Sequence, residues 1–153
     1  MFLKSEKVKN EWTDYNGHMN VAYYIYIFDK AVDVLLTKFN MASDSALKNK
    51  KSTFVVETHT TYNRELKLDD EAEVYLTHFD HDNKRIHYKV SMFSKNKKYL
   101  ASTTEVLSLY VDLEKRKVTE FDLSRVEVMK EFIKKNSTTF QSENLFFANK
   151  LKK

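Results

Sequence analysis

The sequence predicts a single α+β domain in which a curved antiparallel sheet of about five strands wraps around one long central helix, with a further helix near the C-terminus. Three observations predict this class. Apolar residues recur at helical spacing over residues 21–39, apolar and polar residues alternate in four later segments, and an amphipathic helical pattern covers residues 122–136. Because the breaks between these segments are short and polar, we assign residues 1–136 to one domain and residues 137–153 to a tail.

The central helix is predicted for residues 21–39. Its apolar residues follow the i, i+3, i+4, i+7 spacing and are Val21, Tyr24, Ile25, Phe28, Val32, Leu35, Leu36 and Phe39. The first part, VAYYIYIF, is also rich in residues that favour strands, but the spacing sustained over the whole stretch favours a helix. Asn20 is the predicted N-cap. Since the first half is apolar all round, we expect the helix to be buried on every side.

Four segments have the alternation that is typical of antiparallel strands, and the N-terminal residues add a fifth. The strands are predicted at residues 2–12, 52–66, 71–79, 85–93 and 99–111. One face is expected to carry Ile86, Tyr88, Val90 and Met92. In residues 52–66, one face is predicted to carry Val55, Glu57, His59 and Thr61, and the other Phe54, Val56, Thr58, Thr60 and Tyr62. Residues 43–52 are predicted to form a polar connector, and the last helix to begin at Asp122 or Ser124.

Composition excludes several kinds of site and partner. The chain has no cysteine, which excludes disulfides, thiolate nucleophiles and cysteine-based metal sites. Its formal net charge of +4 comes from lysines that are scattered along the chain, so we expect no nucleic-acid partner. No segment has the length and hydropathy of a membrane span, and the start MFLKSEKVKN does not look like a secretory signal. We therefore expect a cytoplasmic protein with no membrane partner.

One short stretch, HFDHD, contains residues that can bind a metal, namely His78, Asp80, His81 and Asp82. The same stretch has the composition of an ordinary polar turn between two strands. We predict no metal site there.

The segment DYNGHMN, residues 14–20, contains Gly17, which is the only glycine of a chain that has no proline. A glycine retained in such a composition indicates a position where the backbone needs a positive φ or must approach another group closely. The segment directly precedes the predicted helix. We therefore expect a tight loop that leads into Asn20.

The pattern Asp-x-x-Gly-His-x-Asn at residues 14–20, followed by Tyr24 and an antiparallel meander, resembles the hotdog-fold acyl-CoA thioesterases of the 4-hydroxybenzoyl-CoA thioesterase type. The likeness extends from residue 1 to about residue 120. More narrowly, EWTDYNGHMN, DKAVD and VVETHTTYNREL are similar to the small thioesterases of carnitine degradation, which act on betainyl-CoA. The resemblance implies hydrolysis of a small acyl-CoA without a cofactor, by a homodimer or homotetramer whose site lies between protomers.

The resemblance also implies catalytic roles within residues 14–21. Asp14, which taken alone is a common turn residue, is expected to activate water as a general base or to attack the thioester directly. The free backbone amides around Asn20 and Val21 are expected to stabilise the oxyanion. Gly17 would let the loop fold tightly, since a Cβ there would crowd the turn or the thioester. Asn16 and His18 either orient the reacting groups or satisfy backbone groups of the loop.

Other residues are candidates for binding the substrate. Glu57 and His59 either form the opposite wall of the site or face water. A trimethylammonium acyl group would call for aromatic faces and a carboxylate. The candidates are Trp12, Tyr15, Tyr24 and Tyr62 with Glu57, and for the phosphates of CoA Arg64, Lys84 and Arg85. Glu105, buried by pattern, is expected at a dimer interface or in the site.

Three alternatives stay open at this point. The acyl group could be aromatic or medium-chain aliphatic instead of betainyl. The scaffold could also serve a non-catalytic acyl-CoA binding or assembly protein. A hydratase of the same fold is disfavoured, because its acid–base pair would be expected on the helix-side loop in a different spacing.

Overall fold

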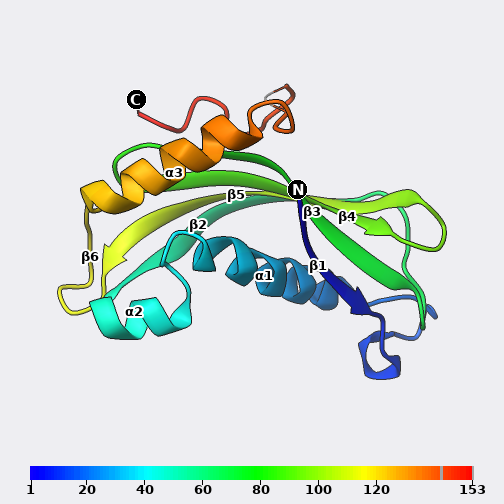
Figure 1. The fold of residues 1–153 in the computed structure, drawn as a ribbon. Coiled ribbons are helices and arrows are strands. Elements are labelled where there is room, and N and C mark those ends of the chain that lie inside the picture. The colour runs from blue at the N-terminus through cyan, green and yellow to red at the C-terminus, as the bar shows by residue number, and fades with distance from the viewer. Residues whose placement is uncertain (142, 153) are drawn as a thin grey trace.

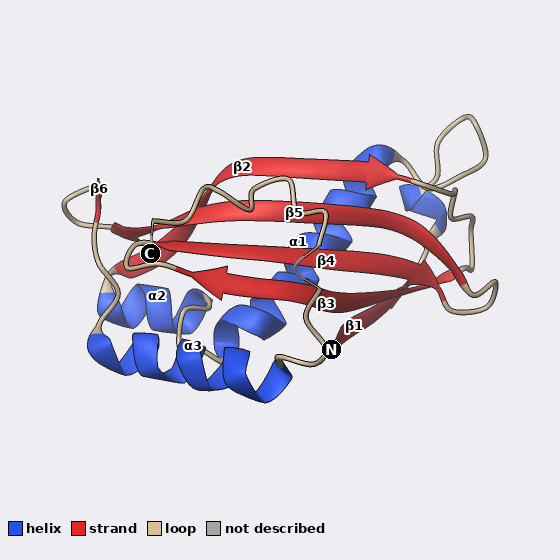
Figure 2. Cartoon of the chain, turned by 90° about the horizontal axis from the view of Figure 1, so that it is seen from above, coloured by secondary structure: helices blue, strands red, loops and turns tan. Residues whose placement is uncertain are grey.

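The computed structural model describes residues 1–141 and 143–152, and its main feature is a curved antiparallel sheet around one long helix (Figure 1). The elements are β1 (Phe2–Lys7), a 3-10 turn (Asn10–Trp12), α1 (Val21–Thr37), α2 (Ser43–Asn49), β2 (Lys51–Tyr62), β3 (Glu71–His81), β4 (Arg85–Ser94), β5 (Tyr99–Asp112), β6 (Lys117–Val118) and α3 (Leu123–Asn136). The strand order is β1-β3-β4-β5-β2, with β6 on the end of β5, as Figure 2 shows from above. None of the helices within these residues is long and apolar enough to cross a membrane.

α1 is the predicted central helix, and it ends at Thr37. Its start is fixed by Asn20, whose side-chain Oδ1 accepts a hydrogen bond of 3.0 Å from the amide of Ala22. Asn20 itself has an extended backbone conformation, as an N-cap residue must. The predicted N-cap is therefore confirmed.

α1 lies on the concave side of the sheet, and one side of the helix is left uncovered (Figure 1). The side that faces the sheet is buried through Tyr24, Ile27, Phe28, Ala31, Val32 and Leu35. On the other side, Val21 and Ile25 keep 54% and 45% of their surface exposed. The prediction that this helix is buried on every side is wrong for the single chain, because the sheet curls around only one side of it.

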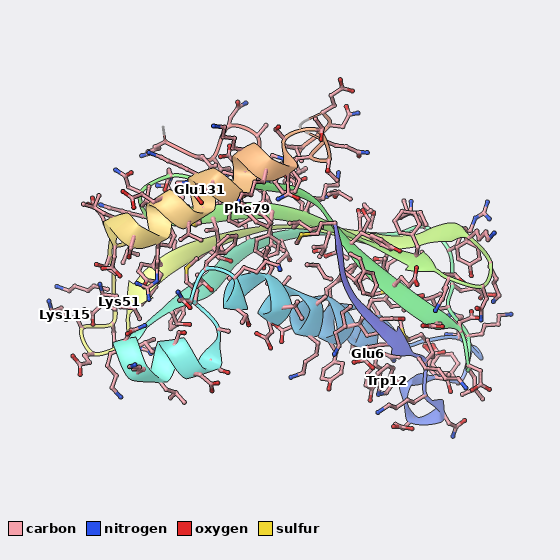
Figure 3. The ribbon with its side chains drawn as sticks, in the orientation of Figure 1. Glu6, Trp12, Lys51, Phe79, Lys115 and Glu131 are labelled. Atoms are coloured by element: carbon pink, nitrogen blue, oxygen red, sulfur yellow. The ribbon has the colours of Figure 1, made fainter. Side chains whose placement is uncertain are left out.

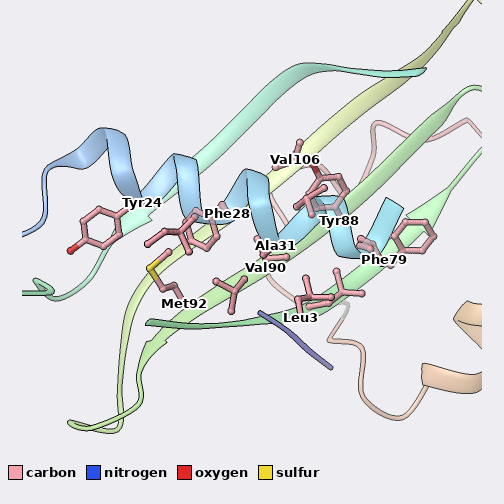
Figure 4. Close-up of a cluster of buried hydrophobic side chains, with 14 of the residues drawn as sticks. Leu3, Tyr24, Phe28, Ala31, Phe79, Tyr88, Val90, Met92 and Val106 are labelled. Atoms are coloured by element: carbon pink, nitrogen blue, oxygen red, sulfur yellow. The ribbon is translucent and has the colours of Figure 1, made fainter. Parts of the chain in front are cut away.

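The concave face of the sheet supplies the other half of the core. The β4 residues on this face are at most 4% exposed and are Ile86, Tyr88, Val90 and Met92, which confirms the predicted alternation. Figure 4 shows Phe28 and Ala31 of α1 close to Val90 and Met92 of the sheet. Burying such large apolar side chains stabilises the fold by about 1.5–3 kcal/mol each. The contact between helix and sheet thus fixes the position of α1.

A β-bulge interrupts the predicted alternation of β2. Val55 pairs with Ser108 of β5, whereas Glu57 already pairs with Leu107, so β2 has one residue more than β5 between these pairs. Neighbouring residues on β5 point to opposite faces, and their partners Val55 and Glu57 must do so too. The prediction that these two share a face is therefore wrong, while the alternation from Glu57 to Tyr62 is kept.

Three segments differ from the sequence-based prediction. Residues 43–49 form α2 instead of a connector, because Ala46 can pack inward while its polar neighbours face solvent. The left-handed conformation of Lys50 then ends this helix. The first strand stops at Lys7 and a 3-10 turn follows it, and the short β6 at residues 117–118 was not predicted.

α3 and the tail lie on the outer, convex side of the sheet (Figure 1). Glu105 of β5 is buried there, and its carboxylate accepts hydrogen bonds of 2.9 and 2.7 Å from the amides of Phe146 and Phe147. It also lies 2.8 Å from Nε2 of His87. Glu105 therefore holds the protein's own tail, a role that the sequence did not suggest. The predicted tail also includes positions 142 and 153, which lie outside the described residues.

These hydrogen bonds keep the Glu105 carboxylate charged. Burial alone would raise the pKa of Glu105, but the amides of Phe147 and Phe146 and the ring of His87 outweigh it and hold the pKa below its usual value. A carboxyl group with a lowered pKa in the folded state stabilises the protein above its unfolded pKa of about 4.3. That stability is lost as the pH falls through the folded pKa.

We expect Glu105→Gln to lower the free energy of unfolding by about 1.5–3 kcal/mol at neutral pH, because hydrogen bonds to a charged group are lost. The difference from wild type should shrink as the pH falls below about 4.3, where Glu105 of the unfolded chain becomes protonated, and should be lost as the pH falls through the lower pKa of the folded state. Urea unfolding at a series of pH values measures this difference. Glu131→Gln on the exposed side of α3 is the control and should change stability little. A difference that does not depend on pH would contradict the role given to the charge.

Candidate active site

Residues 13–20 form a closed loop directly before α1. The amide of Asp14 donates to the carbonyl of His18 at 3.0 Å, and the amide of Gly17 donates to the carbonyl of Asp14 at the same distance. Thr13 and Met19 form an isolated antiparallel bridge at the base of this loop. The loop therefore places Asp14 and His18 opposite one another at its neck.

Gly17 has a φ of +75°, which is a conformation that residues with side chains rarely adopt. A Cβ built at this position would meet no atom within 4 Å. The prediction of a positive φ is thus confirmed, whereas the expected crowding of the turn by a Cβ is wrong for this chain. The loop depends on the backbone conformation of Gly17.

The Asp14 side chain is held in place with one oxygen left open. Its Oδ1 accepts a hydrogen bond of 2.9 Å from the amide of Asn16 and lies 4.0 Å from Nδ1 of His18. No group within residues 1–141 and 143–152 donates to Oδ2, and the side chain is 17% exposed. The His18 ring also approaches the carbonyl of Met19 at 3.3 Å. A water molecule or a thioester can therefore reach a carboxylate that is already positioned.

The first turn of α1 presents one open amide. The amide of Asn20 donates to the carbonyl of Trp12 at 2.8 Å, and the amide of Ala22 donates to the Asn20 side chain. Asn20 is therefore not the free donor that the sequence suggested. The amide of Val21 donates to no acceptor among the described residues, and it lies at the positive end of the helix dipole. It is the donor in this turn that a ligand can use.

A cavity of about 380 Å³ opens at the start of α1. Its lining residues come from the loop, the helix and the end of β2, and they are His18, Met19, Val21, Tyr24, Tyr62, Asn63, Arg64 and Glu65. The rings of Tyr24 and Tyr62 meet edge to face with 5.4 Å between their centroids. The Tyr24 hydroxyl accepts a hydrogen bond of 3.0 Å from the amide of Leu66, and burial raises the pKa of this phenol. The ring pair is therefore neutral and fixed in position at physiological pH.

The two aromatic residues before Gly17 lie away from this cavity. Trp12 is buried beside the N-terminal end of α1, where its ring stacks on Tyr23 at 5.3 Å (Figure 3). Tyr15 at the tip of the loop is 98% exposed. The prediction that Trp12 and Tyr15 belong to a substrate cage is wrong for the single chain, because one packs into the core and the other points to solvent.

Glu57 and His59 also lie outside the cavity, since they point to the convex face of the sheet. Lys150 of the tail forms an ion pair of 3.1 Å with Glu57, and Phe146 stacks on His59 with 4.3 Å between the ring centroids. The sequence left open whether this pair forms a wall of the site or faces water. In the structure it contacts the tail instead.

The three cations that were predicted to hold CoA are not close together. Arg64 lines the cavity, but Arg85 pairs in the sheet with Leu109, whose other partner is Phe54. The stretch of β2 from Phe54 to Tyr62 takes up most of the strand and is roughly 26 Å long at about 3.3 Å per residue.

Lys84 and Arg85 belong to the turn at that far end of the sheet. Arg85 is 3.2 Å from Asp82, and Lys84 is 3.5 Å from Glu120. Within the single chain, these two predicted CoA-binding cations therefore lie far from the cavity. Arg64 is the candidate that the structure keeps, and its guanidinium lies over the ring of Tyr99 at 5.2 Å.

The stretch with metal-binding residue types is occupied by other contacts. The Asp82 carboxylate accepts hydrogen bonds from the amides of Lys84, Arg85 and Lys152. His81 lies 3.1 Å from the carbonyl of Asp82. Within the described part of the chain, no three His, Asp or Glu side chains are grouped as a metal site would require.

Three lining residues were not among the predicted site residues, namely Met19, Asn63 and Glu65. The reason for the last two is that the strand predicted for residues 52–66 ends at Tyr62. The chain then turns, and residues 63–65 reach the cavity instead of continuing the sheet. The run Asn-Arg-Glu after the β-branched segment was the available signal for this end.

Comparisons with known proteins agree with this geometry. A family model described as the thioesterase-like superfamily matches residues 8–135. The chain is 30% identical over 124 residues to a betainyl-CoA thioesterase of Pseudomonas aeruginosa, which covers 79% of this chain and 78% of that protein. It is 31% identical over 110 residues to an L-carnitine dehydrogenase/betainyl-CoA thioesterase of Rhizobium meliloti, covering 72% of this chain but only 22% of that longer protein.

Two solved structures share the architecture over most of their length. A Staphylococcus aureus protein in complex with CoA has a TM-score of 0.81 and 28% identity, covering 88% of this chain and 85% of that one. A candidate thioesterase from Pseudomonas putida has a TM-score of 0.79 and 26% identity, covering 95% and 94%. The predicted α+β hotdog fold is thereby confirmed.

We expect Gly17→Ala to destabilise the protein by about 1–2 kcal/mol, because alanine must adopt the left-handed conformation while its Cβ meets no neighbour. Gly17→Asn should cost less, since asparagine adopts this conformation more readily. Urea unfolding of the two variants measures the difference. Equal losses in both variants would show that something other than backbone conformation requires glycine here.

Proposed function

Because this chain belongs to the thioesterase-like superfamily, we propose that it hydrolyses a small acyl-CoA thioester to the free acid and CoA. The proposal is carried by an open carboxylate oxygen on Asp14, in the loop before α1, and by an open amide on Val21 at the start of α1. Asp14 belongs to the loop whose His18 lines the cavity, and Val21 lines the same cavity. A thioester bound there meets a base or nucleophile on one side and a donor for its carbonyl oxygen on the other.

The reaction can follow either of two routes from this geometry. In the first, Asp14 takes a proton from water while the water oxygen attacks the carbonyl carbon. In the second, the Asp14 carboxylate attacks that carbon itself and gives a mixed anhydride, which water then hydrolyses. In both, the C–S bond breaks and CoA leaves as its thiolate, which then takes up a proton. The Val21 amide would stabilise the oxyanion, and such a donor is commonly worth about 3–4 kcal/mol.

The most specific candidate for the substrate is betainyl-CoA. The support is the likeness to betainyl-CoA thioesterases, which extends over most of the chain. The ring pair of Tyr24 and Tyr62 on the cavity wall also suits a trimethylammonium group, because such cations are attracted to aromatic faces. Thioesters with aromatic or medium-chain acyl groups are the alternative.

We further propose that the chain acts as a homodimer or homotetramer. β2 is an edge strand that pairs only with β5 within the described ranges, and long unpaired edges are normally covered. β2 and α1 both leave large apolar side chains exposed, which are Phe54, Val55, Val56 and Tyr62 on β2 and Val21, Ile25 and Tyr26 on α1. A second copy placed against this surface would bury them.

We expect Asp14→Asn to lower kcat by about 10²–10⁴-fold with the fold intact, because the amide can neither accept a proton nor attack. Thioester cleavage is followed by release of the CoA thiol, and unfolding by urea verifies the fold. Asp44→Asn in the exposed first turn of α2 is the matched control and should keep full activity. If Asp14→Asn retains wild-type kcat, the chain has another catalytic group or is a binding protein.

The acyl group is tested on the same wild-type preparation with betainyl-, butyryl- and benzoyl-CoA. The proposal predicts the highest kcat/KM for betainyl-CoA. A preference for benzoyl- or butyryl-CoA would exclude betainyl-CoA as the preferred substrate, while thioester hydrolysis would remain the proposed reaction.

A further inference from the structure

The cavity at the start of α1 has a single carboxylate among its lining residues, that of Glu65. This residue follows Asn63 and Arg64, where the chain turns after β2. The same cavity is lined by Tyr24 and Tyr62. One acidic residue and two aromatic residues therefore line the same small cavity.

The backbone around Glu65 is held from both sides. The hydroxyl of Tyr99 donates a hydrogen bond to the carbonyl of Glu65. The next amide, that of Leu66, donates to the hydroxyl of Tyr24 at 3.0 Å. Leu66 is itself fully buried, and its carbonyl accepts from the amide of Met19. The point from which the Glu65 side chain leaves the backbone is thus fixed relative to the ring pair.

The Glu65 side chain is charged and can be reached by a ligand. It is 50% exposed, and its Oε1 lies 2.9 Å from Nζ of Lys67. This hydrogen bond from Lys67 lowers the pKa of Glu65. The Glu65 charge in turn contributes to raising the pKa of the Tyr24 phenol, behind the effect of burial. The carboxylate therefore acts electrostatically on the groups of the cavity.

Lys67 and Arg64 do not prevent Glu65 from meeting a cationic ligand. Lys67 is 55% exposed, and ion pairs at such positions contribute little, so a ligand charge can replace it. The guanidinium of Arg64 lies over the ring of Tyr99, and its distance from the ring centre is 5.2 Å. This cation–π contact gives the Arg64 side chain, which lines the cavity, a binding partner of its own.

A quaternary ammonium group has a specific requirement that this arrangement meets. It has no N–H to donate, so it is recognised by aromatic faces and by the field of a nearby carboxylate. An uncharged group of the same shape makes the same apolar contacts but gains nothing from the carboxylate. The change in this selectivity when the carboxylate is replaced therefore measures the contribution of the carboxylate.

We infer that Glu65, together with the rings of Tyr24 and Tyr62, is the specificity-determining residue that selects an acyl group with a quaternary ammonium. The inference rests on the proposed thioester hydrolysis and deepens it by naming how the acyl group is recognised. Glu65 takes the place that the sequence gave to Glu57, which is bound to the tail on the opposite face of the sheet.

The test compares two substrates that differ in one atom. Betainyl-CoA carries a trimethylammonium group, and tert-butylacetyl-CoA carries the same shape with carbon in place of the nitrogen. Glu65→Gln should lower kcat/KM for betainyl-CoA by about tenfold or more and should change the value for tert-butylacetyl-CoA by less than about twofold. Glu114→Gln, in the exposed turn after β5, is the matched control and should change neither value.

Arg64→Gln separates acyl recognition from CoA recognition, since both substrates share CoA. It should lower kcat/KM for the two substrates by the same factor. Equal effects of Glu65→Gln on both substrates, or no effect on either, would overturn the inference. So would a wild type that prefers tert-butylacetyl-CoA, although hydrolysis itself would then stand. A wild type that cleaves none of the thioesters would overturn the proposed function along with the inference.

Discussion

The chemistry depends on how the chain enters α1. Asn20 uses its side chain to cap the amide of Ala22 and its own amide to bond the carbonyl of Trp12. These two bonds leave the amide of Val21 without a partner in the described structure, at the positive end of a helix that is packed against the sheet. The loop before Asn20, which holds Asp14 opposite His18, closes through the positive φ of Gly17. Because the amide and the carboxylate are already fixed in position, no free energy is spent on reorienting them when charge develops on a substrate. This is the physical advantage of the way in which the chain enters α1.

The two faces of the sheet have different structural roles. The concave face packs on α1 and leads to the cavity beyond Tyr62, whereas the convex face carries buried carboxylates that bind the tail. The bulge in β2 contributes to this division, since it sends Glu57 to the convex face. A charge that the linear sequence places beside the site thus contacts the tail. Buried carboxylates such as Glu105 are stable there because backbone amides satisfy them.

The sequence alone predicted the parts of the fold that follow local periodicity. The central helix, its cap at Asn20, four of the strands and the positive φ of Gly17 were all found. What failed depends on contacts between distant segments, which periodicity does not contain. The bulge changes which β2 residues share a face of the sheet. β2 also ends earlier than predicted, so that Glu65 reaches the cavity. Of the aromatic candidates, Tyr24 and Tyr62 line the cavity, whereas Trp12 packs into the core and Tyr15 points to solvent.

The central claim is that the open amide of Val21 and the carboxylate of Asp14 face the same thioester carbonyl. A crystal structure with a betainyl-CoA analogue, in which a methylene replaces the thioester sulfur, tests this most directly. We expect the analogue's carbonyl oxygen about 2.7–3.1 Å from the nitrogen of Val21, with its carbonyl carbon facing Asp14 and its ammonium group beside Tyr24 and Tyr62. A carbonyl bound away from the first turn of α1, with the Val21 amide still free, would contradict it.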